Sequence, residues 1–454
     1  MTSMEIYDSL KRSKVQFEPI KEGHVGMYVC GPTVYGPSHL GHASTYIAFD
    51  IIRRAFEYLG YKVKLVVNIT DVHDDMIKQA NKEGITIFEL ADKNIKQYME
   101  DLAELNILPA DVFPRVTEHI KEIIQMVEKL VENGYAYETD DGVYFNVAKF
   151  EGYGKLSGIK LEEGETGKRV ETDKYDKEGV ADFALWKKAK PGEPTWPSPW
   201  GEGRPGWHIE CSVMSSKYLG MPFDIHGGAL DLRFPHHENE IAQSEAATGK
   251  EFVKYWMHAG ILKVDGQKMS KSLGNFINIP EILEKYDPMV LRYWRATVHY
   301  RSEINYQEST IEAAKAALGK LRGYVAGWRA AGGVGKVDSK FRSEFVKALE
   351  DDFGLPEAVA VLWKVVKSGK MSDADKLATV LDFDRVLGLG LAEFKGDEKQ
   401  VTKDTKLKID KLVKERDLAR KDKDWNRADE IRGELDKMGV IIEDTDDGSV
   451  WSLK

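Results

Sequence analysis

Residues 25–70 read VGMYVCGPTVYGPSHLGHASTYIAFDIIRRAFEYLGYKVKLVVNIT, and the hydrophobic pattern changes twice within this stretch. Apolar residues alternate from Val25 to Val29, which predicts a strand. Residues 44–60 have helical spacing and end in a glycine, and residues 61–69 form a β-branched run that predicts a second strand. A strand, a helix and a strand within about 45 residues predict a βαβ unit with a right-handed crossover and a parallel sheet.

The same unit predicts where a ligand binds, because ligands of such sheets bind beyond the carboxyl ends of the strands. Cys30 follows the first strand, His39 and His42 precede the helix, and Thr70 ends the second strand. We therefore expect these four side chains to face one crevice, which is the candidate active site.

The whole chain has the length and composition of a multidomain globular protein. Its 454 residues predict three or four domains, and 42% hydrophobic with 31% charged residues is typical of a chain that folds throughout. The N-terminus has no basic segment followed by an apolar run, and no window approaches about 18 consecutive apolar residues, so we expect a cytoplasmic protein with no membrane partner. A net charge of -10 argues against broad nonspecific binding to nucleic acid and leaves a local basic groove open.

Beyond residue 113 the pattern predicts an insertion that separates two halves of one sheet, followed by a helical region and a charged tail. The insertion extends to about residue 190, and a second helix-and-strand region continues to about Gly260. The elements expected in these regions are a helix over 116–133, a hairpin over 135–145, a charged loop over 162–179, helices over 281–295 and 309–329, a glycine-rich break at 330–335, further helices to about 391, and a charge-dense helix over 406–438 before a short β-like end.

The chain has two cysteines, 181 positions apart, which leaves a single bridge, free thiols or a shared metal as options. Cys211 is expected on a helix, and the segment FPHHENEIAQSEAATG places His236 and Glu240 four apart on one helical face. Two thiolates, an imidazole and a carboxylate are a plausible Zn²⁺ set. The same spacing also fits two ordinary buried cysteines and a polar helix face that bind no metal. If a metal is bound, His237 could replace His236 as the ligand.

The residues HLGH at 39–42 precede the predicted helix, so their imidazoles and the free amides of the helix could meet a polyphosphate. Gly41 would let the backbone approach the phosphate closely. Two histidines three apart on a first turn are also common as solvated or capping residues, so this motif alone is a weak signal.

The residues KMSKS at 268–272 give a stronger signal, because a full match arises by chance in a chain of this length with a probability on the order of 10⁻⁴. A mobile loop bearing Lys268 and Lys271 can close over ATP and offset the charge that develops on leaving pyrophosphate. The alternative is a polar surface loop.

Together these residues resemble the class I cysteinyl-tRNA synthetases. The resemblance covers about residues 26–292 with specific motifs and continues more loosely to the C-terminus, and the usual HIGH is here HLGH. The motifs that carry it are CGPTVY at 30–35, HLGH at 39–42, NITDV at 68–72, GRPGWHIECS at 203–212, DIHGGALDLRFPHHENEIAQS at 224–244 and KMSKS at 268–272.

The resemblance implies an α/β fold: a Rossmann-like parallel-sheet catalytic domain split by an insertion, then a helical bundle and a small mixed α/β C-terminal domain. The implied boundaries are 1–115 for the first half of the catalytic domain, 116–200 for the connective insertion, 201–265 for the second half, 266–308 for the KMSKS loop and a linking helical subdomain, 309–400 for a helical tRNA-binding bundle, and 401–454 for an anticodon-binding domain.

The resemblance also implies roles for individual residues, which fall into a metal site, an ATP site and a cysteine pocket. These residues are Cys30, Cys211, His236 and Glu240 for one zinc ion per subunit; His39, Gly41, His42, Asp231, Lys268 and Lys271 for ATP, with His39, His42, Lys268 and Lys271 also assisting catalysis; and Thr70 and Trp207 for the cysteine pocket.

The implied reaction activates L-cysteine with ATP and Mg²⁺ to cysteinyl-adenylate and pyrophosphate, then transfers cysteine to the 3′-terminal ribose of tRNA(Cys). A pocket that reads shape alone rejects serine by only about 10–200-fold, whereas zinc prefers a thiolate to an alcohol. Zinc coordination would therefore select cysteine without an editing domain. We expect the enzyme to act as a monomer.

Two other functions remain open at this stage. One is an ATP-dependent cysteine ligase acting on a small amine acceptor, which would not need an anticodon-reading tail, and the other is a noncatalytic tRNA- or zinc-binding module. The tail could read bases through arginine and tryptophan, or it could be a solvated charged helix. The tail residues concerned are Arg416, Arg420, Lys421, Lys423, Trp425, Arg427 and Arg432.

Overall fold

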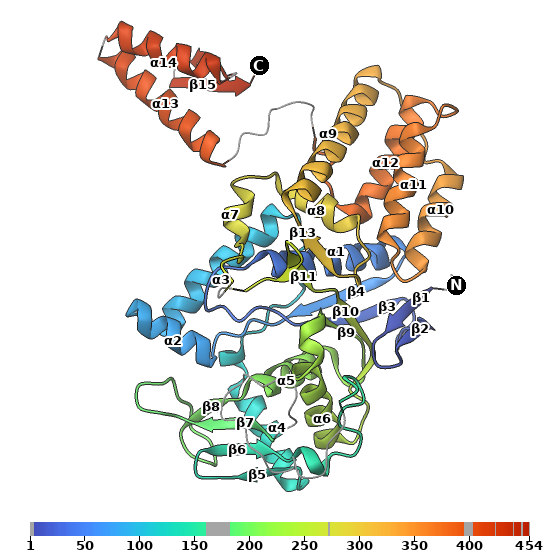
Figure 1. The fold of residues 1–454 in the computed structure, drawn as a ribbon, viewed down its shortest axis with the longest axis vertical. Helices are drawn as coiled ribbons and strands as arrows, with labels where there is room; N and C mark the ends of the chain where they lie inside the picture. Colours follow the sequence, from blue (N-terminus) through green and yellow to red (C-terminus); the bar gives the residue numbers. More distant parts are fainter. Residues whose placement is uncertain are drawn as a thin grey trace.

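A four-stranded parallel sheet forms the centre of the fold, in the order β10-β9-β3-β4 (Figure 1). Its strands are β3 (His24–Val29), β4 (Lys62–Val67), β9 (Phe223–Ala229) and β10 (Val253–Ala259), so the two halves of the sheet come from distant parts of the chain. The computed structural model describes residues 4–159, 182–270, 273–394, 403–422, 424–438, 440–445 and 448–453.

The predicted βαβ unit is confirmed: β3 and β4 pair in parallel and α1 (Leu40–Tyr58) connects them. The helix begins at Leu40, earlier than the hydrophobic period indicates, because His39 caps it. Helices α2 (Asp74–Glu83) and α3 (Ile87–Glu104) follow β4. A short antiparallel pair, β1 (Glu5–Asp8) and β2 (Ser13–Gln16), precedes the sheet.

The insertion forms an antiparallel sheet of its own in the order β5-β6-β7-β8. The predicted helix over 116–133 is a 3₁₀ turn followed by α4 (Ile120–Glu132), with the break at His119. The predicted charged loop over 162–179 lies outside the described residues. The strands of this sheet are β5 (Ala136–Glu138), β6 (Gly142–Phe145), β7 (Phe183–Lys188) and β8 (Gly203–Pro205).

Two helices and a short turn complete the second half of the catalytic region. These are α5 (Trp207–Leu219), the 3₁₀ turn Leu230–Arg233 and α6 (His236–Thr248). Next, β11 (Leu262–Val264) pairs with β12 (Gln267–Lys268) and with β13 (Ile304–Tyr306).

The region after the KMSKS motif is helical, as predicted. The helix expected over 281–295 is two helices, because Asp287 caps a new one that has Pro288 at its first position. The helices are α7 (Ile279–Leu283), α8 (Pro288–Ala296), α9 (Glu308–Ala331), α10 (Ser339–Glu350), α11 (Leu355–Lys367) and α12 (Asp373–Leu387).

Arg292 of α8 is fully buried and joins the helical region α8–α12 to the catalytic domain. Its guanidinium pairs with Asp50 on α1 and donates to the carbonyl of Leu387 at 2.6 Å. Because Asp50 also pairs with Arg54 at 2.8 Å, this contact is a small buried network that joins α1, α8 and the end of α12.

The C-terminal region contains α13 (Lys403–Lys421), α14 (Trp425–Lys437) and the hairpin of β14 (Val440–Thr445) and β15 (Gly448–Leu453). The single helix predicted over 406–438 is wrong, because Asp424 accepts a hydrogen bond from the amide of Arg427 and caps a second helix. Ile409, Ile431 and Leu435 lie in a core separate from the rest of the protein.

No helix in the described part of the chain has both the length and the apolar character that crossing a membrane requires.

Candidate active site

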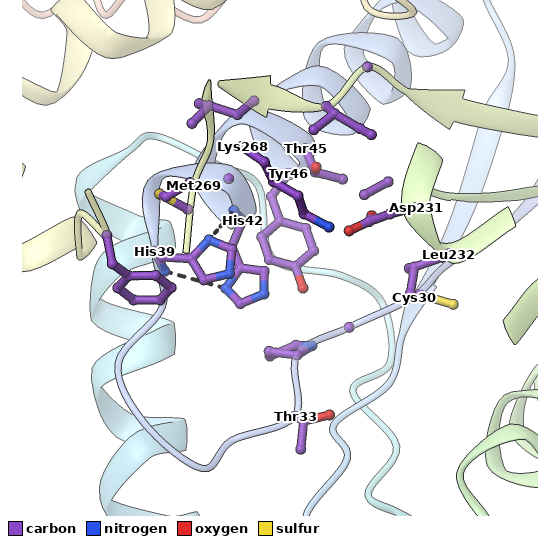
Figure 2. A pocket seen from close by; sticks show the side chains of 18 of the residues that line it. Cys30, Thr33, His39, His42, Thr45, Tyr46, Asp231, Leu232, Lys268 and Met269 are labelled. Atoms are coloured by element: carbon purple, nitrogen blue, oxygen red, sulfur yellow. Dashed lines mark hydrogen bonds between the residues drawn. The ribbon is translucent and has the colours of Figure 1, made fainter. Parts of the chain in front are cut away.

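A cleft of about 290 Å³ opens at the carboxyl end of the parallel sheet, where the βαβ unit predicted a crevice (Figure 2). Seven predicted site residues line it: Cys30, His39, Gly41, His42, Trp207, Asp231 and Lys268. Thr70 is not among the described residues that line the cleft, and Lys271 lies outside the described residues. The cleft therefore brings together residues from the start of α1, the end of β3, the start of α5 and the edge of β12.

The two histidines of HLGH both cap α1 and line the cleft. The amide of His42 donates to Nδ1 of His39 at 3.3 Å, and the rings stack with their centroids 3.7 Å apart. Burial lowers the pKa of His42 well below its ordinary value, so the ring is neutral at physiological pH. A Cβ on Gly41 would lie 3.0 Å from the His39 ring, so a side chain there would crowd the pair. The capping alternative for this motif is therefore confirmed, and the same two rings also line the cleft, where the predicted contact with a polyphosphate stays a prediction.

Lys268 also lines the cleft, from the edge strand β12, and its side chain is exposed. Figure 2 shows its amine directed into the cleft near Asp231. Asn275 holds the start of the following loop, because its side chain donates to the carbonyl of Lys268 at 3.2 Å and accepts from the amide of Ser270 at 2.8 Å. A positive charge thus enters the cleft beside the Asp231 carboxylate.

The four predicted metal ligands converge beside the cleft, with all donor atoms within 4.8 Å of one another. The Sγ atoms of Cys30 and Cys211 are 4.0 Å apart, and Nε2 of His236 lies 3.4 Å from Sγ of Cys211 and 3.2 Å from Oε1 of Glu240. Cys30 ends β3, Cys211 lies on α5, and the other two lie one turn apart on α6. All four side chains are buried.

A second group of donors overlaps the first and consists of Cys30, His226, His237 and Glu240. In this group Nε2 of His237 lies 3.3 Å from Sγ of Cys30, and Nε2 of His226 lies 2.8 Å from Oε2 of Glu240. The other ring nitrogen of His237 lies 2.9 Å from Nε2 of His258. Each of the two histidines that the sequence left open as ligands thus belongs to a donor group in the structure. Only the group with His236 includes both cysteines.

Burial sets the protonation of this cluster. It raises the pKa of Cys30 well above its ordinary value and that of Glu240 to about 8, and it lowers the pKa of His236 to about 3. At pH 7 the metal-free cluster thus has neutral acids and an imidazole with a free lone pair. Two sulfurs, one imidazole and one carboxylate within a few ångströms match the donors that Zn²⁺ takes in proteins, so these residues fit a zinc ion.

The two residues predicted for the cysteine pocket, Trp207 and Thr70, are both held by neighbouring side chains. The indole of Trp207 stacks on His236 with centroids 4.6 Å apart and an interplanar angle of 30°. Thr70 is buried, and its hydroxyl donates to Oε2 of Glu210 at 2.8 Å. Thr70 therefore reaches the cleft wall through its backbone, which pairs with that of Thr33.

Several residues of the site were not predicted from the sequence. Thr33, Tyr35 and Tyr46 line the cleft, and Figure 2 shows the Tyr46 hydroxyl between His42 and Cys30. His208, His226 and His258 are buried around the donor cluster. A histidine inside an apolar strand, as in FDIHGGA, is a usable signal of such a cluster, whereas nothing in the spacing of Thr33, Tyr35 or Tyr46 distinguishes them from core residues.

Comparison with known sequences gives two family matches. Residues 16–316 match the model described as "tRNA synthetases class I (C) catalytic domain", and residues 402–451 match "Cysteinyl-tRNA ligase anticodon binding domain". The chain is 49% identical to the cysteine–tRNA ligase of Thermococcus onnurineus and 48% identical to that of Pyrococcus horikoshii, and each alignment covers 99% of both chains. A bacterial relative, the cysteine–tRNA ligase of Idiomarina loihiensis, is 46% identical over 99% of both chains.

Solved structures share the fold at low identity. A Mycobacterium tuberculosis methionyl-tRNA synthetase in complex with methionyl-adenylate superposes with a TM-score of 0.56 at 17% identity, over 83% of this chain and 92% of that one. An Agrobacterium radiobacter LeuRS in a ternary complex superposes with a TM-score of 0.58 at 12% identity, over 84% of this chain and 85% of that one. The α/β fold predicted from the sequence is thereby confirmed.

Proposed function

Because the chain belongs to the cysteine–tRNA ligases of the class I aminoacyl-tRNA synthetases, we propose that its buried thiol cluster is a zinc site that selects cysteine. The enzyme uses ATP to activate L-cysteine and transfers the cysteine to tRNA(Cys). The alternative of a small amine acceptor has no support, since a match to an anticodon-binding domain covers residues 402–451. The observation that carries the zinc proposal is the convergence of Cys30, Cys211, His236 and Glu240.

We favour His236 over His237 as the imidazole ligand. Its Nε2 faces both Cys211 and Glu240, so a single ion can reach all four donors. His237 has Nε2 near Cys30 and its other nitrogen near His258, and its group leaves Cys211 out. His226 then supports Glu240 from outside the ligand set, at 2.8 Å.

The cluster lies at the end of the cleft where Cys30 and Trp207 form the wall, and there the side chain of the amino acid would enter. When bound, zinc supplies a strong bond to a thiolate and a weak one to an alcohol. The indole of Trp207 and the backbone beside Thr70 would enclose the remainder of a small amino acid, which excludes water from the same space.

The opposite end of the cleft would hold Mg-ATP. The imidazoles of His39 and His42 and the amides of the first turn of α1 would face the phosphates, Gly41 would leave room for them, and Asp231 would lie toward the adenosine. Lys268, with Lys271 from the adjoining loop, would stabilise the departing pyrophosphate. The cysteine carboxylate attacks the α-phosphorus as the bond to the β-phosphate oxygen breaks, so positioning and charge stabilisation provide most of the catalysis.

The C-terminal domain would read the anticodon. Trp425 is 58% exposed at the start of α14, and Arg427 follows it two residues later on the surface. Exposed indole and guanidinium groups are the kinds of side chain that stack on unpaired RNA bases. The roles of these residues, the domain boundaries given above, the monomeric state and a cytoplasmic location belong to the same proposal.

The test combines metal analysis with cysteine-dependent exchange of pyrophosphate into ATP. Cys30→Ser and His236→Ala should each lower bound zinc well below one equivalent and slow exchange at least about tenfold. His24→Ala, which changes a histidine away from the cluster, is the matched control and should keep both. Full zinc occupancy in both variants would refute the ligand assignment.

A further inference from the structure

We propose that Asp74 and Arg204, whose side chains are 20% and 6% exposed, form a largely buried ion pair that acts as a positioning device for Trp207, and so sets the affinity of the enzyme for cysteine. This inference rests on the proposed function, in which Trp207 borders the cysteine pocket. Neither Asp74 nor Arg204 lines the cleft, so both would act through another residue.

The ion pair is part of a small network between two segments that are distant in the sequence. Nη2 of Arg204 lies 2.5 Å from Oδ1 of Asp74, and its Nε lies 3.2 Å from Oε2 of Glu193. Nζ of Lys187 lies 3.1 Å from the other oxygen of Asp74. The side chains of Arg204 and Lys187 are only 6% and 10% exposed, and two cations face two carboxylates, so the charges balance.

The two ends of the network lie beside the cysteine pocket. Asp74 begins α2, directly after His73 and four residues after Thr70, which follows β4. Arg204 lies in β8 of the insertion sheet, three residues before Trp207. The pair thus ties the edge of the catalytic sheet to the insertion where the chain enters α5 (Figure 1).

Trp207 follows Arg204 in the chain and contacts the segment of Asp74 through His73. Its ring stacks on His236 and also meets His73 edge-on, with centroids 5.8 Å apart and an interplanar angle of 72°. The intervening Gly206 is fixed, because its amide donates to the carbonyl of Leu185 at 2.9 Å and a Cβ there would lie 1.9 Å from the carbonyl oxygen of Ala184. The backbone between Arg204 and Trp207 therefore has little freedom to absorb a shift, and a displaced Arg204 displaces the indole.

Burial makes this pair different from an ordinary surface pair of the same sheet. Lys188 and Glu138 lie 3.4 Å apart with side chains 31% and 53% exposed, and such pairs contribute little. Removing one member of a buried pair leaves the other charge uncompensated and is strongly destabilising, so the first test must keep the charge.

Arg204→Lys is the first variant, because it keeps the positive charge but cannot reach Asp74 and Glu193 at once with a planar fork. We expect KM for cysteine in pyrophosphate exchange to rise about tenfold while KM for ATP stays within about twofold and Tm changes by no more than about 2 °C. Asp74→Asn should likewise raise KM for cysteine and leave KM for ATP nearly unchanged, with a larger loss of stability. Lys188→Gln is the matched control and should change neither KM.

A double-mutant cycle with Trp207→Ala separates positioning from general scaffolding. If Asp74 acts through Trp207, Asp74→Asn adds no further increase in KM for cysteine in the Trp207→Ala background. Additive effects, equal increases of both KM values, or an unchanged KM for cysteine in Arg204→Lys and Asp74→Asn would each overturn the inference. The proposed place of Trp207 at the cysteine pocket fails separately, if Trp207→Ala alone leaves KM for cysteine unchanged.

Discussion

At the scale of single residues, burial decides which groups of the donor cluster carry a proton. Desolvation holds Cys30, Cys211 and Glu240 in their neutral forms near pH 7, and it keeps His236 unprotonated down to about pH 3. A cation reverses this balance, because thiolates and a carboxylate are better ligands than thiols and a carboxylic acid. Metal binding to this cluster is therefore coupled to the loss of protons from its ligands.

We predict that zinc binding to the metal-free protein at pH 7 releases about three protons, one each from Cys30, Cys211 and Glu240, and none from His236. The sign follows from the raised pKa values: the affinity for zinc should rise with pH, by up to about 10³-fold per pH unit below the pKa of Glu240, about 8, and less steeply above it. Calorimetry in buffers of different ionisation enthalpy measures the number. Cys211→Ser should release about two protons, and release of fewer than two by the unaltered protein would contradict the prediction.

The lysines of the KMSKS motif give a second prediction at this scale. Lys268→Ala should slow adenylate formation at least about tenfold, roughly 1.4 kcal/mol, with little effect on cysteine binding, because its amine faces the cleft. The same loss is expected for Lys271→Ala. Lys263→Ala, across the β11–β12 ladder and paired with Glu303 at 2.7 Å, is the control. Pre-steady-state adenylation at the normal rate in Lys268→Ala would remove this role.

At the scale of elements, the site depends on how closely the end of β3 approaches the end of β4. Gly31 directly follows Cys30, and a Cβ on Gly31 would lie 1.6 Å from the carbonyl oxygen of Asn68. The amide of Gly31 also donates to the side chain of Asn68 at 2.8 Å. Only glycine permits this approach, and the approach fixes where the Cys30 sulfur lies.

We predict that Gly31→Ala weakens zinc binding at least about tenfold and lowers Tm by several degrees, because the two strand ends must separate. Gly36→Ala, in the same loop, has nothing within 4 Å of its added carbon and should leave both quantities unchanged. Competition with a chromogenic chelator measures the zinc affinity, and thermal unfolding measures Tm. Equal effects of the two substitutions would show that the position of Cys30 does not depend on this contact.

Element boundaries show where sequence patterns were insufficient. The helices expected over 116–133, 281–295 and 406–438 each divide in the structure, although the hydrophobic period continues through the division. Asp287 and Asp424 divide two of these predicted helices, because their side chains cap new helices. A cap is a local hydrogen bond that can begin a new helix without changing the spacing of the apolar residues. A prediction based on that spacing alone therefore overlooks it.

At the scale of the whole molecule, one buried core extends from the catalytic sheet into the bundle, a second joins the catalytic region to the insertion, and the C-terminal domain has a core of its own. We predict that a chain ending at residue 394 retains cysteine-dependent pyrophosphate exchange within about threefold, while charging of tRNA(Cys) falls at least about 100-fold. Trp425→Ala in the full chain should reproduce part of the second loss without the first. Loss of exchange on truncation would show that the tail also supports the catalytic region.

The sequence by itself determined the βαβ unit, the edge of the sheet at which ligands bind, and the motifs that identify the family, because these depend on local period and on short runs of residues. Only the tertiary structure decided which side chains meet. It placed Cys30, Cys211 and Glu240 together from three segments, gave His236 and His237 different neighbours, and set Thr70 behind the cleft. The reason is physical: contacts between distant segments depend on the packing of whole sheets and helices, and no spacing within one segment encodes them.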